Sequence, residues 1–255
     1  MRPEVIIEIR ELKKRFEDNL VLDGVNLNIC RGETLVVMGG SGCGKSVLLK
    51  NITGLIKPDS GEILFKGDNI TGFTREELFK MRMSFGMLFQ GSALFDSMSV
   101  GENVALPLIK HTDLNDGEVE KIVLEKLDLV GLADVTDKYP AELSGGMKKR
   151  VALARAVVMD PEVILYDEPT TGLDPVMAGV INRLILDLQK NLDITSIVVT
   201  HDIQSAYMVA DCIAMLHGGK IIFEGSPEQV QNTDNETVRT FINGGAVAAE
   251  KTQRE

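Results

Sequence analysis

Short runs of apolar, largely β-branched residues alternate along the chain with stretches in which apolar residues recur every three or four positions. The first third contains four such runs, which predict strands at residues 5–10, 25–29, 34–38 and 62–67, with a turn at 59–61. Between residues 92 and 160 the three- and four-residue spacing dominates. That stretch is therefore predicted to be a mostly helical insert.

After Pro161 the short apolar runs return at residues 163–169, 195–201, 212–216 and 220–225, and helices are expected from about residues 176 and 202. Because these runs contain few polar positions, we predict that they form central parallel strands, buried on both faces. The whole pattern is typical of an α/β protein with a largely parallel sheet. Residues 244–255 have little apolar content and are expected to form a flexible tail or an arm that contacts a partner.

The charge balance of the 255-residue chain argues against some partners. With 27 Lys and Arg against 38 Asp and Glu, the formal charge is −11, so no long-range attraction to nucleic acid or to an anionic bilayer is expected. A local basic cluster, Lys148–Arg150, is interpreted as a solvated helix face. No apolar stretch approaches the ~18 residues of a membrane span, and the N-terminus lacks a signal-peptide core, which together predict a soluble protein. The three cysteines form no metal-binding pattern and favour a reducing compartment (Cys30, Cys43, Cys212).

A glycine-rich loop of the pattern GxxxxGK[ST] stands directly after an apolar strand and directly before a helical stretch. In such a loop the glycines permit a tight turn, and backbone N–H groups at the helix N-terminus hold phosphate groups. Lys45 adds a positive charge for the phosphates, and the Ser46 hydroxyl is suited to bind Mg²⁺. The pattern predicts a nucleotide-binding loop made of Gly39, Gly40, Ser41, Gly42, Cys43, Gly44, Lys45, Ser46 and Val47.

Two later strands end in side chains that could complete a nucleotide hydrolase. Asp167 and Glu168 close one apolar run, and His201 closes the next. In open α/β folds, ligands bind at the edge where parallel strands have their carboxyl ends. We predict that Asp167 binds Mg²⁺, that Glu168 is the general base or positions the attacking water, and that His201 is catalytic or senses the γ-phosphate. The remaining histidines, His111 and His217, are expected on the surface.

The sequence LSGGM at residues 143–147 completes an ordered set of motifs that resembles the ATP-binding subunits of ATP-binding-cassette (ABC) transporters. In chain order the set comprises the phosphate loop, Gln90 in LFQ, LSGG, LYDEP, the GLDP turn at residues 172–175 and His201. The resemblance covers roughly residues 5–240 and implies that the nucleotide is ATP, which is hydrolysed with Mg²⁺. It further implies that Phe16 stacks on adenine, and that Gln90 reaches Mg²⁺ and the attacking water while reporting to a membrane partner.

The same resemblance implies an architecture: a P-loop NTPase core of the RecA-like type, with an N-terminal antiparallel β subdomain and a helical signature subdomain. One ATP-binding domain is expected over residues 1–243, with the helical subdomain inserted at about 92–160 and the tail at 244–255.

The LSGG motif also carries an implication about assembly. In the family that the chain resembles, Ser144, Gly145 and Gly146 contact the ATP held by a second subunit, so a two-fold dimer with two nucleotides at its interface is expected. The resemblance also implies that Asp174 links the two nucleotide sites across that interface. Position 147 departs from the usual LSGGQ, because Met147 replaces glutamine and any contact made by that glutamine is missing. The Ser-Gly-Gly anion site is retained, so activity is expected.

Residues 86–108, together with LYDEPTTGLDP, resemble more closely the ATPases of Mce-type lipid transporters, including the Mla system, which moves phospholipid between the inner and outer membranes of Gram-negative bacteria. This finer resemblance implies three further partners: an integral inner-membrane permease dimer, a periplasmic lipid-binding Mce-type protein and a small cytoplasmic regulator. The chain would sit at the cytoplasmic face of the inner membrane, with its tail beyond Gly244 contacting the neighbouring subunit.

Other functions remain open at this point. The same ATPase could serve an importer for amino acids or metal complexes, from which only residues 86–108 separate it. A soluble cassette ATPase of iron–sulfur assembly would have no membrane partner, whereas DNA-repair and ribosomal types are disfavoured by the acidic charge and the lack of a coiled-coil insertion. A P-loop kinase or GTPase is a further alternative, strongly disfavoured by the LSGG helix and His201, and no NKxD-type guanine-reading motif is present.

Overall fold

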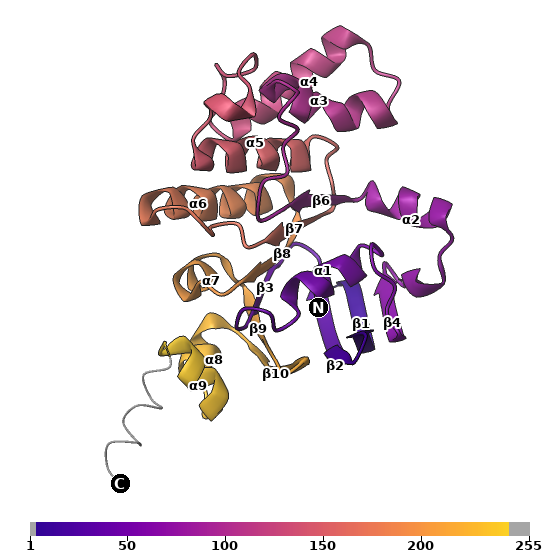
Figure 1. The fold of residues 1–255 in the computed structure, drawn as a ribbon, viewed down its shortest axis with the longest axis vertical. Helices are drawn as coiled ribbons and strands as arrows, with labels where there is room; N and C mark the ends of the chain where they lie inside the picture. Colours follow the sequence, from indigo (N-terminus) through magenta and orange to yellow (C-terminus); the bar gives the residue numbers. More distant parts are fainter. Residues whose placement is uncertain (1–3, 245–255) are drawn as a thin grey trace. The chain divides into compact units, whose positions relative to one another are not determined.

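The computed structural model describes residues 4–244, which divide into two compact units. Of the described residues, 4–74 and 198–244 belong to the first unit and 75–197 to the second (Figure 1). The predicted tail contact beyond Gly244 lies outside the described residues. No helix among residues 4–244 has the length and apolarity that a membrane crossing requires.

The first unit contains a four-stranded antiparallel sheet with the strand order β2-β1-β4-β5. Its strands are β1 (Val5–Phe16), β2 (Asn19–Cys30), β4 (Ser60–Phe65) and β5 (Asp68–Asn69). Ile7, Ile9 and Leu12 are buried, with a shift of register between Ile9 and Leu12, as expected for an irregular strand in a sheet with one covered face. The antiparallel N-terminal β subdomain is thus confirmed. Both hairpin strands are longer than predicted, because polar residues beyond the apolar runs continue the pairing, for example Lys13 with Asp23.

Three further strands of the first unit are β3 (Thr34–Met38), β9 (Cys212–His217) and β10 (Lys220–Gly225), accompanied by α1 (Lys45–Ile52), α7 (Ile203–Val209), α8 (Pro227–Gln231) and α9 (Glu236–Ile242). β3 pairs with β9 in parallel and is buried at every position. The prediction that residues 220–225 form a central parallel strand is wrong, since β10 is antiparallel to β9 and only half-buried. The connection through Gly218 and Gly219, both with positive φ, is a two-residue turn that can join only antiparallel strands.

The second unit contains the parallel pair β6 (Phe85–Leu88) and β7 (Val163–Asp167). Its helices are α2 (Arg75–Arg82), α3 (Val100–His111), α4 (Asp116–Leu129), α5 (Gly145–Val157) and α6 (Pro175–Leu192). The stretch predicted to be helical contains α3, α4 and α5, and capping boxes begin the first two of these helices. The strand β6 was not predicted, because its four residues give too short a pattern. The boundary between the units falls within β8 (Thr195–Thr200), whose six residues are all buried.

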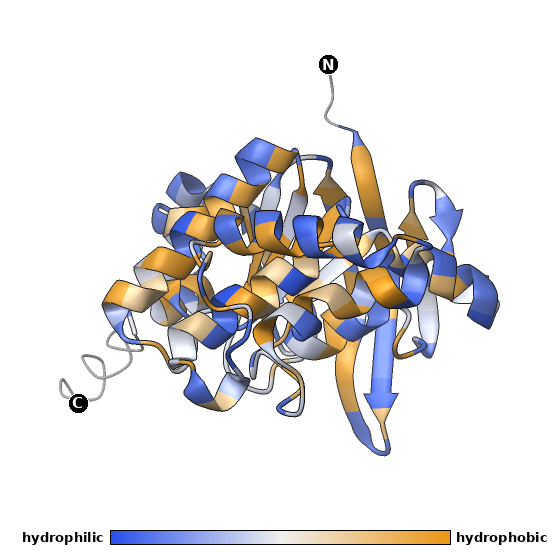
Figure 2. Cartoon of the chain, turned by 90° about the horizontal axis from the view of Figure 1, so that it is seen from above, coloured by the Kyte–Doolittle hydropathy of each residue, from blue (hydrophilic) through white to orange (hydrophobic). Residues whose placement is uncertain are grey.

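The helices carry hydrophobic residues on one side and hydrophilic residues on the other, as Figure 2 shows. One residue of α5 departs from this division and corrects a prediction. Lys149 was expected on a solvated face, but its exposed fraction is only 4%. It lies three residues after Gly146 and three before Ala152, both buried, so helical spacing puts all three on the covered side.

Candidate functional site

The glycine-rich loop joins the buried strand β3 to the N-terminus of α1. Gly44 precedes the helix with φ 108°, a conformation that L side chains rarely adopt. The Lys45 ammonium is buried and donates to the carbonyl oxygens of Gly39 and Gly40, at 2.8 and 3.1 Å. Gly40, Ser41 and Gly42 are exposed, whereas Cys43, Ser46 and Val47 are half-buried. The loop thus has exposed residues next to a fixed positive charge at a helix N-terminus, an arrangement suited to a polyphosphate.

The inner side of this loop is closely packed. A Cβ atom on Gly39 would come within 2.4 Å of the Leu216 carbonyl oxygen and 2.6 Å of the Cys43 sulfur. A Cβ atom on Gly44 would meet Val21 of β2 at 3.0 Å, so the β1–β2 hairpin lies against the loop. Phe16 ends β1 in this hairpin and is 43% exposed, with the Lys14 ammonium 5.4 Å from its ring centroid. An exposed aromatic side chain on a hairpin that borders a phosphate loop is placed to receive a flat ring system.

His201 lies in the first unit, directly before α7. The Asp202 carboxylate caps that helix by accepting from the backbone N–H of Gln204 at 3.0 Å, which fixes the turn. The imidazole of His201 is exposed. It borders a cavity of about 740 Å³ that is also lined by Gly40 and Ser41, so the first unit brings His201 and the phosphate loop to one cavity.

In the second unit, β7 ends in two acidic residues that are nearly covered. Asp167 is 9% exposed and Glu168 is 8% exposed. Glu168 has φ 50°, in the left-handed region that non-glycine residues rarely occupy, so the chain turns sharply directly after the strand. The Thr171 hydroxyl donates to the Glu168 carboxylate at 3.1 Å and orients it.

Gln90 follows β6 in the second unit and is exposed. Its backbone carbonyl accepts from the Lys149 ammonium at 2.5 Å, and the same ammonium lies 3.4 Å from the carbonyl oxygen of Glu168. Burial lowers the pKa of Lys149, while the carboxylates of Asp167 and Glu168 oppose that shift. The burial of Lys149 and its contacts to both segments were not predicted, although its place on the apolar side of the helical pattern was a usable signal.

The LSGG turn forms the start of α5. The Ser144 hydroxyl accepts from the backbone N–H of Met147 at 3.3 Å and caps the helix. Ser144 and Gly145 are exposed, whereas Gly146 is buried beneath the Met177 side chain. Asp174 caps α6 through two N–H groups at 3.0 Å. The signature turn and the turn before α6 therefore lie side by side within the second unit.

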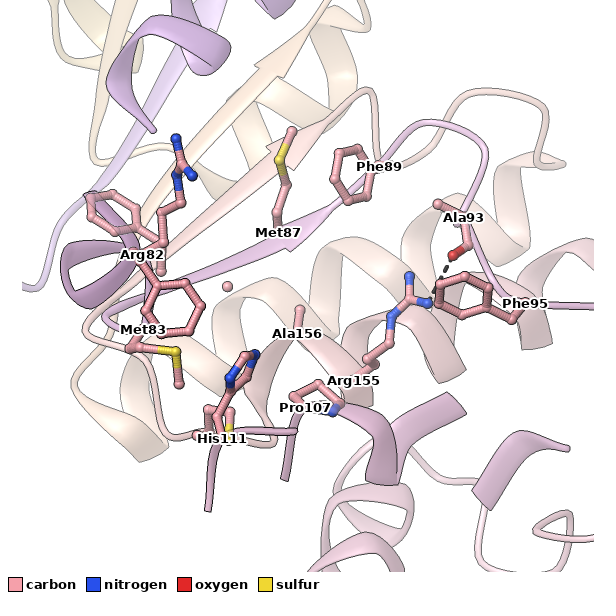
Figure 3. Close-up of a pocket in the computed structure, with 14 residues that line it drawn as sticks. Arg82, Met83, Met87, Phe89, Ala93, Phe95, Pro107, His111, Arg155 and Ala156 are labelled. Atoms are coloured by element: carbon pink, nitrogen blue, oxygen red, sulfur yellow. Dashed lines mark hydrogen bonds between the residues drawn. The ribbon is translucent and has the colours of Figure 1, made fainter. Parts of the chain in front are cut away.

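A groove of about 540 Å³ opens beside β6 in the second unit. Figure 3 shows aromatic and methionine side chains around it, together with Arg155, which donates to the Ala93 carbonyl at 2.8 Å. Phe95 is 50% exposed, far more than an aromatic side chain in a core. His111 is exposed as predicted, and its ring also borders this groove, 5.3 Å from the ring of Phe79.

Known sequences similar to this chain are ATP-binding proteins of transporters. The profile of the ABC transporter family matches residues 22–171. The probable ribonucleotide transport ATP-binding protein mkl of Mycobacterium leprae is 44% identical over 240 residues, which cover 94% of this chain and 69% of the relative. The intermembrane phospholipid transport system ATP-binding protein MlaF of Haemophilus influenzae is 43% identical over 239 residues, which cover 94% of this chain and 90% of the relative.

Two solved structures have the same fold. One is cbiO1 from Clostridium perfringens, part of the ABC transporter complex cbiONQ, with a TM-score of 0.83 and 38% identity over 93% of this chain and 94% of that one. The other is the dimeric, post-hydrolysis state of the ATP-binding cassette MJ0796 bound to ADP and Pi. Its TM-score is 0.80 at 34% identity, over 87% of this chain and 98% of that one.

Proposed function

The chain belongs to the ABC transporter family of ATP-binding proteins, and from this premise we propose that it is the ATP-hydrolysing, energy-coupling subunit of a phospholipid transporter. The observation that carries the ATPase part is the phosphate loop, where a buried lysine and a helix N-terminus face one exposed glycine turn. The loop and the family both support ATP as substrate.

In the first unit, the loop residues and Lys45 bind the phosphates of ATP, and Phe16 stacks on the adenine ring. His201 contacts the γ-phosphate, a role supported by the cavity that it shares with Gly40 and Ser41. The imidazole can donate a hydrogen bond there and stabilise charge that develops on the phosphoryl oxygens.

In the second unit, Glu168 accepts a proton from the attacking water or orients it, and Gln90 holds the same water. The left-handed turn at Glu168 and the hydrogen bond from Thr171 fix the carboxylate before substrate arrives. Gln90 and Asp167 each offer an oxygen donor of the kind that Mg²⁺ prefers, as does Ser46 of the first unit, and each is proposed as a Mg²⁺ ligand. When bound, this ion neutralises charge on the β- and γ-phosphates.

The working unit is a dimer of this chain, as in the solved dimeric cassette. Ser144, Gly145 and Gly146 would present a helix N-terminus to the γ-phosphate on the second copy. The absence of an acidic residue from the first turn of α5 supports an anion there, since a carboxylate would repel it. Asp174, at the adjacent turn, would link the two nucleotides.

The groove beside β6 is the proposed contact with an inner-membrane permease. Its lining is mostly apolar and aromatic, with exposed Phe95 and Phe79, and it also includes Arg82, His111 and Arg155. Exposed aromatic side chains around a concave surface are typical of protein interfaces. With that partner the chain would lie at the cytoplasmic face of the inner membrane. A periplasmic lipid-binding Mce-type protein and a small cytoplasmic regulator would complete the assembly.

Phospholipid is proposed as the transported molecule because of the share of each relative's length that the match covers. The match to the phospholipid-transport relative spans 90% of that protein, whereas the match to the ribonucleotide-transport relative spans 69%. The two identities, 43% and 44%, do not separate the candidates. Transport of a ribonucleotide is therefore kept as an outcome of the test.

The test is mass spectrometry of the proteins and lipids that co-purify with the tagged chain after its native membranes are extracted in mild detergent. The proposal expects a multi-spanning permease, a lipid-binding periplasmic protein and bound phospholipid. Recovery of a permease for nucleotides, amino acids or metal complexes would show that the transported molecule is not phospholipid. Recovery of no membrane protein would remove the transporter assignment and leave only ATP hydrolysis.

A further inference from the structure

One buried lysine holds two segments that carry proposed catalytic side chains. The Lys149 ammonium donates to the backbone carbonyl of Gln90 at 2.5 Å and lies 3.4 Å from that of Glu168. Lys149 belongs to α5, whose first turn is formed by Gly145 and Gly146 after Ser144. The signature helix is therefore bonded directly to both segments, all within the second unit.

The buried charge calls for an explanation, because a lysine away from water is costly. The same unit has a second buried lysine, Lys126, which is 6% exposed and donates to the Asp160 carboxylate at 2.6 Å. Lys149 instead uses backbone carbonyls as acceptors, with the charges of Asp167 and Glu168 nearby. An apolar side chain would fill this position at less cost in desolvation, so the three donors of the ammonium are the property that matters.

A second cation of α5 strengthens the link to the Gln90 loop. Arg155 donates to the carbonyl oxygens of Ser92 and Ala93, each at 2.8 Å. Both of these loop residues have positive φ, at 63° and 49°. Left-handed conformations in non-glycine residues persist where surrounding contacts hold them. The loop from residue 90 to 93 is thus fixed to α5 at two points, Lys149 at one end and Arg155 at the other.

We propose that Lys149 is a positioning residue, which couples the signature helix to Gln90 and Glu168 so that both adopt their hydrolytic positions together. Gln90 is exposed and follows a short strand, so its backbone would otherwise be free to shift. A displacement of about 1 Å in a catalytic group lowers rates by up to about a hundredfold. The inference rests on the proposed ATP hydrolysis and not on the identity of the transported molecule.

The test compares variants of the chain in complex with its permease. Lys149→Met removes the donors at similar volume, Lys149→Arg keeps donors, and Lys126→Met controls for the loss of a buried lysine elsewhere in the unit. We expect Lys149→Met to lower kcat for ATP roughly ten- to hundredfold with KM within about twofold, and Lys149→Arg to recover most of the rate. Lys126→Met is expected to change stability and to leave kcat within about twofold of wild type.

Hydrogen exchange shows which segments lose protection when the ammonium is removed. In Lys149→Met, amide exchange should accelerate at residues 89–93 and 168–171, whereas in Lys126→Met these segments should exchange as in wild type. Should Lys149→Met fail to fold, Lys149→Leu, which also lacks a hydrogen-bond donor, takes its place with the same expectation.

The proposal would be overturned if Lys149→Met and Lys126→Met had equal kcat. It would also be overturned if Lys149→Met changed KM and left kcat as in wild type. A complex that hydrolyses ATP but moves no phospholipid would refute the proposed transport function, and the ranking of the Lys149 variants would still decide this inference.

Discussion

Gly39 and Leu216 approach so closely that a Cβ atom on Gly39 would lie 2.4 Å from the Leu216 carbonyl oxygen. The contact joins the first residue of the phosphate loop to β9, which pairs with β3. The acceptor belongs to a strand backbone, so it cannot move aside as a flexible side chain would. The loop therefore takes its position from the sheet beneath it.

Substituting Gly39→Ala should displace the loop and weaken ATP binding by roughly tenfold or more, because the new methyl group has no space. Gly40→Ala is the matched comparison, since a Cβ atom at Gly40 meets nothing within 4 Å. Titration of each variant with a fluorescent ATP analogue measures the effect. Equal affinities for the two variants would contradict this view of the loop.

Replacing Glu168 by Gln should slow ATP hydrolysis by about a hundredfold or more, because the amide cannot accept the proton of the attacking water. Binding of ATP should persist, so the variant should accumulate as an ATP-bound dimer. Size-exclusion chromatography with Mg-ATP checks the dimer, and a phosphate-release assay checks the rate. Turnover near that of wild type would remove Glu168 from the proposed role.

Replacing Phe95 by Ser should weaken association with the permease by roughly tenfold, because this half-exposed ring lines the groove beside β6. Leu124→Ser serves as the control, since Leu124 is 42% exposed on α4 and does not line the groove. Affinity purification with quantitative mass spectrometry gives the yield of permease. Similar losses in both variants would show that the groove has no special part in docking.

Glu33 provides a prediction about pH. Burial raises its pKa above the ordinary 4.5, and the carboxylates of Asp211 and Glu224 add to the shift, although the backbone N–H of Cys30 opposes it. The folded state therefore binds the proton of Glu33 more tightly than the unfolded state does. This tighter proton binding stabilises the folded state below about pH 4.5, and the contribution is lost as the pH rises through the folded pKa.

Removing the charge of Glu33 should therefore stabilise the folded state at neutral pH. Glu33→Gln is expected to raise the melting temperature by about 1–3 °C at pH 7 and to have little effect at pH 4. Thermal unfolding followed by circular dichroism across this range measures the difference. A Glu33→Gln variant that is less stable than wild type at pH 7 would contradict the assigned cause.

Much of the fold could be predicted from local sequence, because its strands are short apolar runs and the phosphate loop is specified by adjacent residues. The buried strands β3 and β7 coincide with such runs. The antiparallel direction of β10 was available from Gly218 and Gly219, and it was overlooked because its apolar composition resembles that of a central strand.

Other features depend on packing between distant segments, which composition does not encode. Lys149 looks like its neighbour Lys148, and only the approach of the Gln90 loop and of Glu168 reveals its partners. The same holds for Gly39, since Leu216 is far along the chain. The left-handed φ of Glu168 could not be predicted either, because the sequence around it is typical of the end of a strand.

Phospholipid transport can be measured as ATP-dependent transfer of phospholipid by the chain reconstituted with its membrane partners. Donor vesicles carry a fluorescent phospholipid, and transfer to the partner lipid-binding protein or to acceptor vesicles is followed with and without ATP. We expect transfer that requires ATP and disappears in Lys45→Ala. Hydrolysis of ATP without any lipid transfer, or with transport of a nucleotide instead, would contradict it.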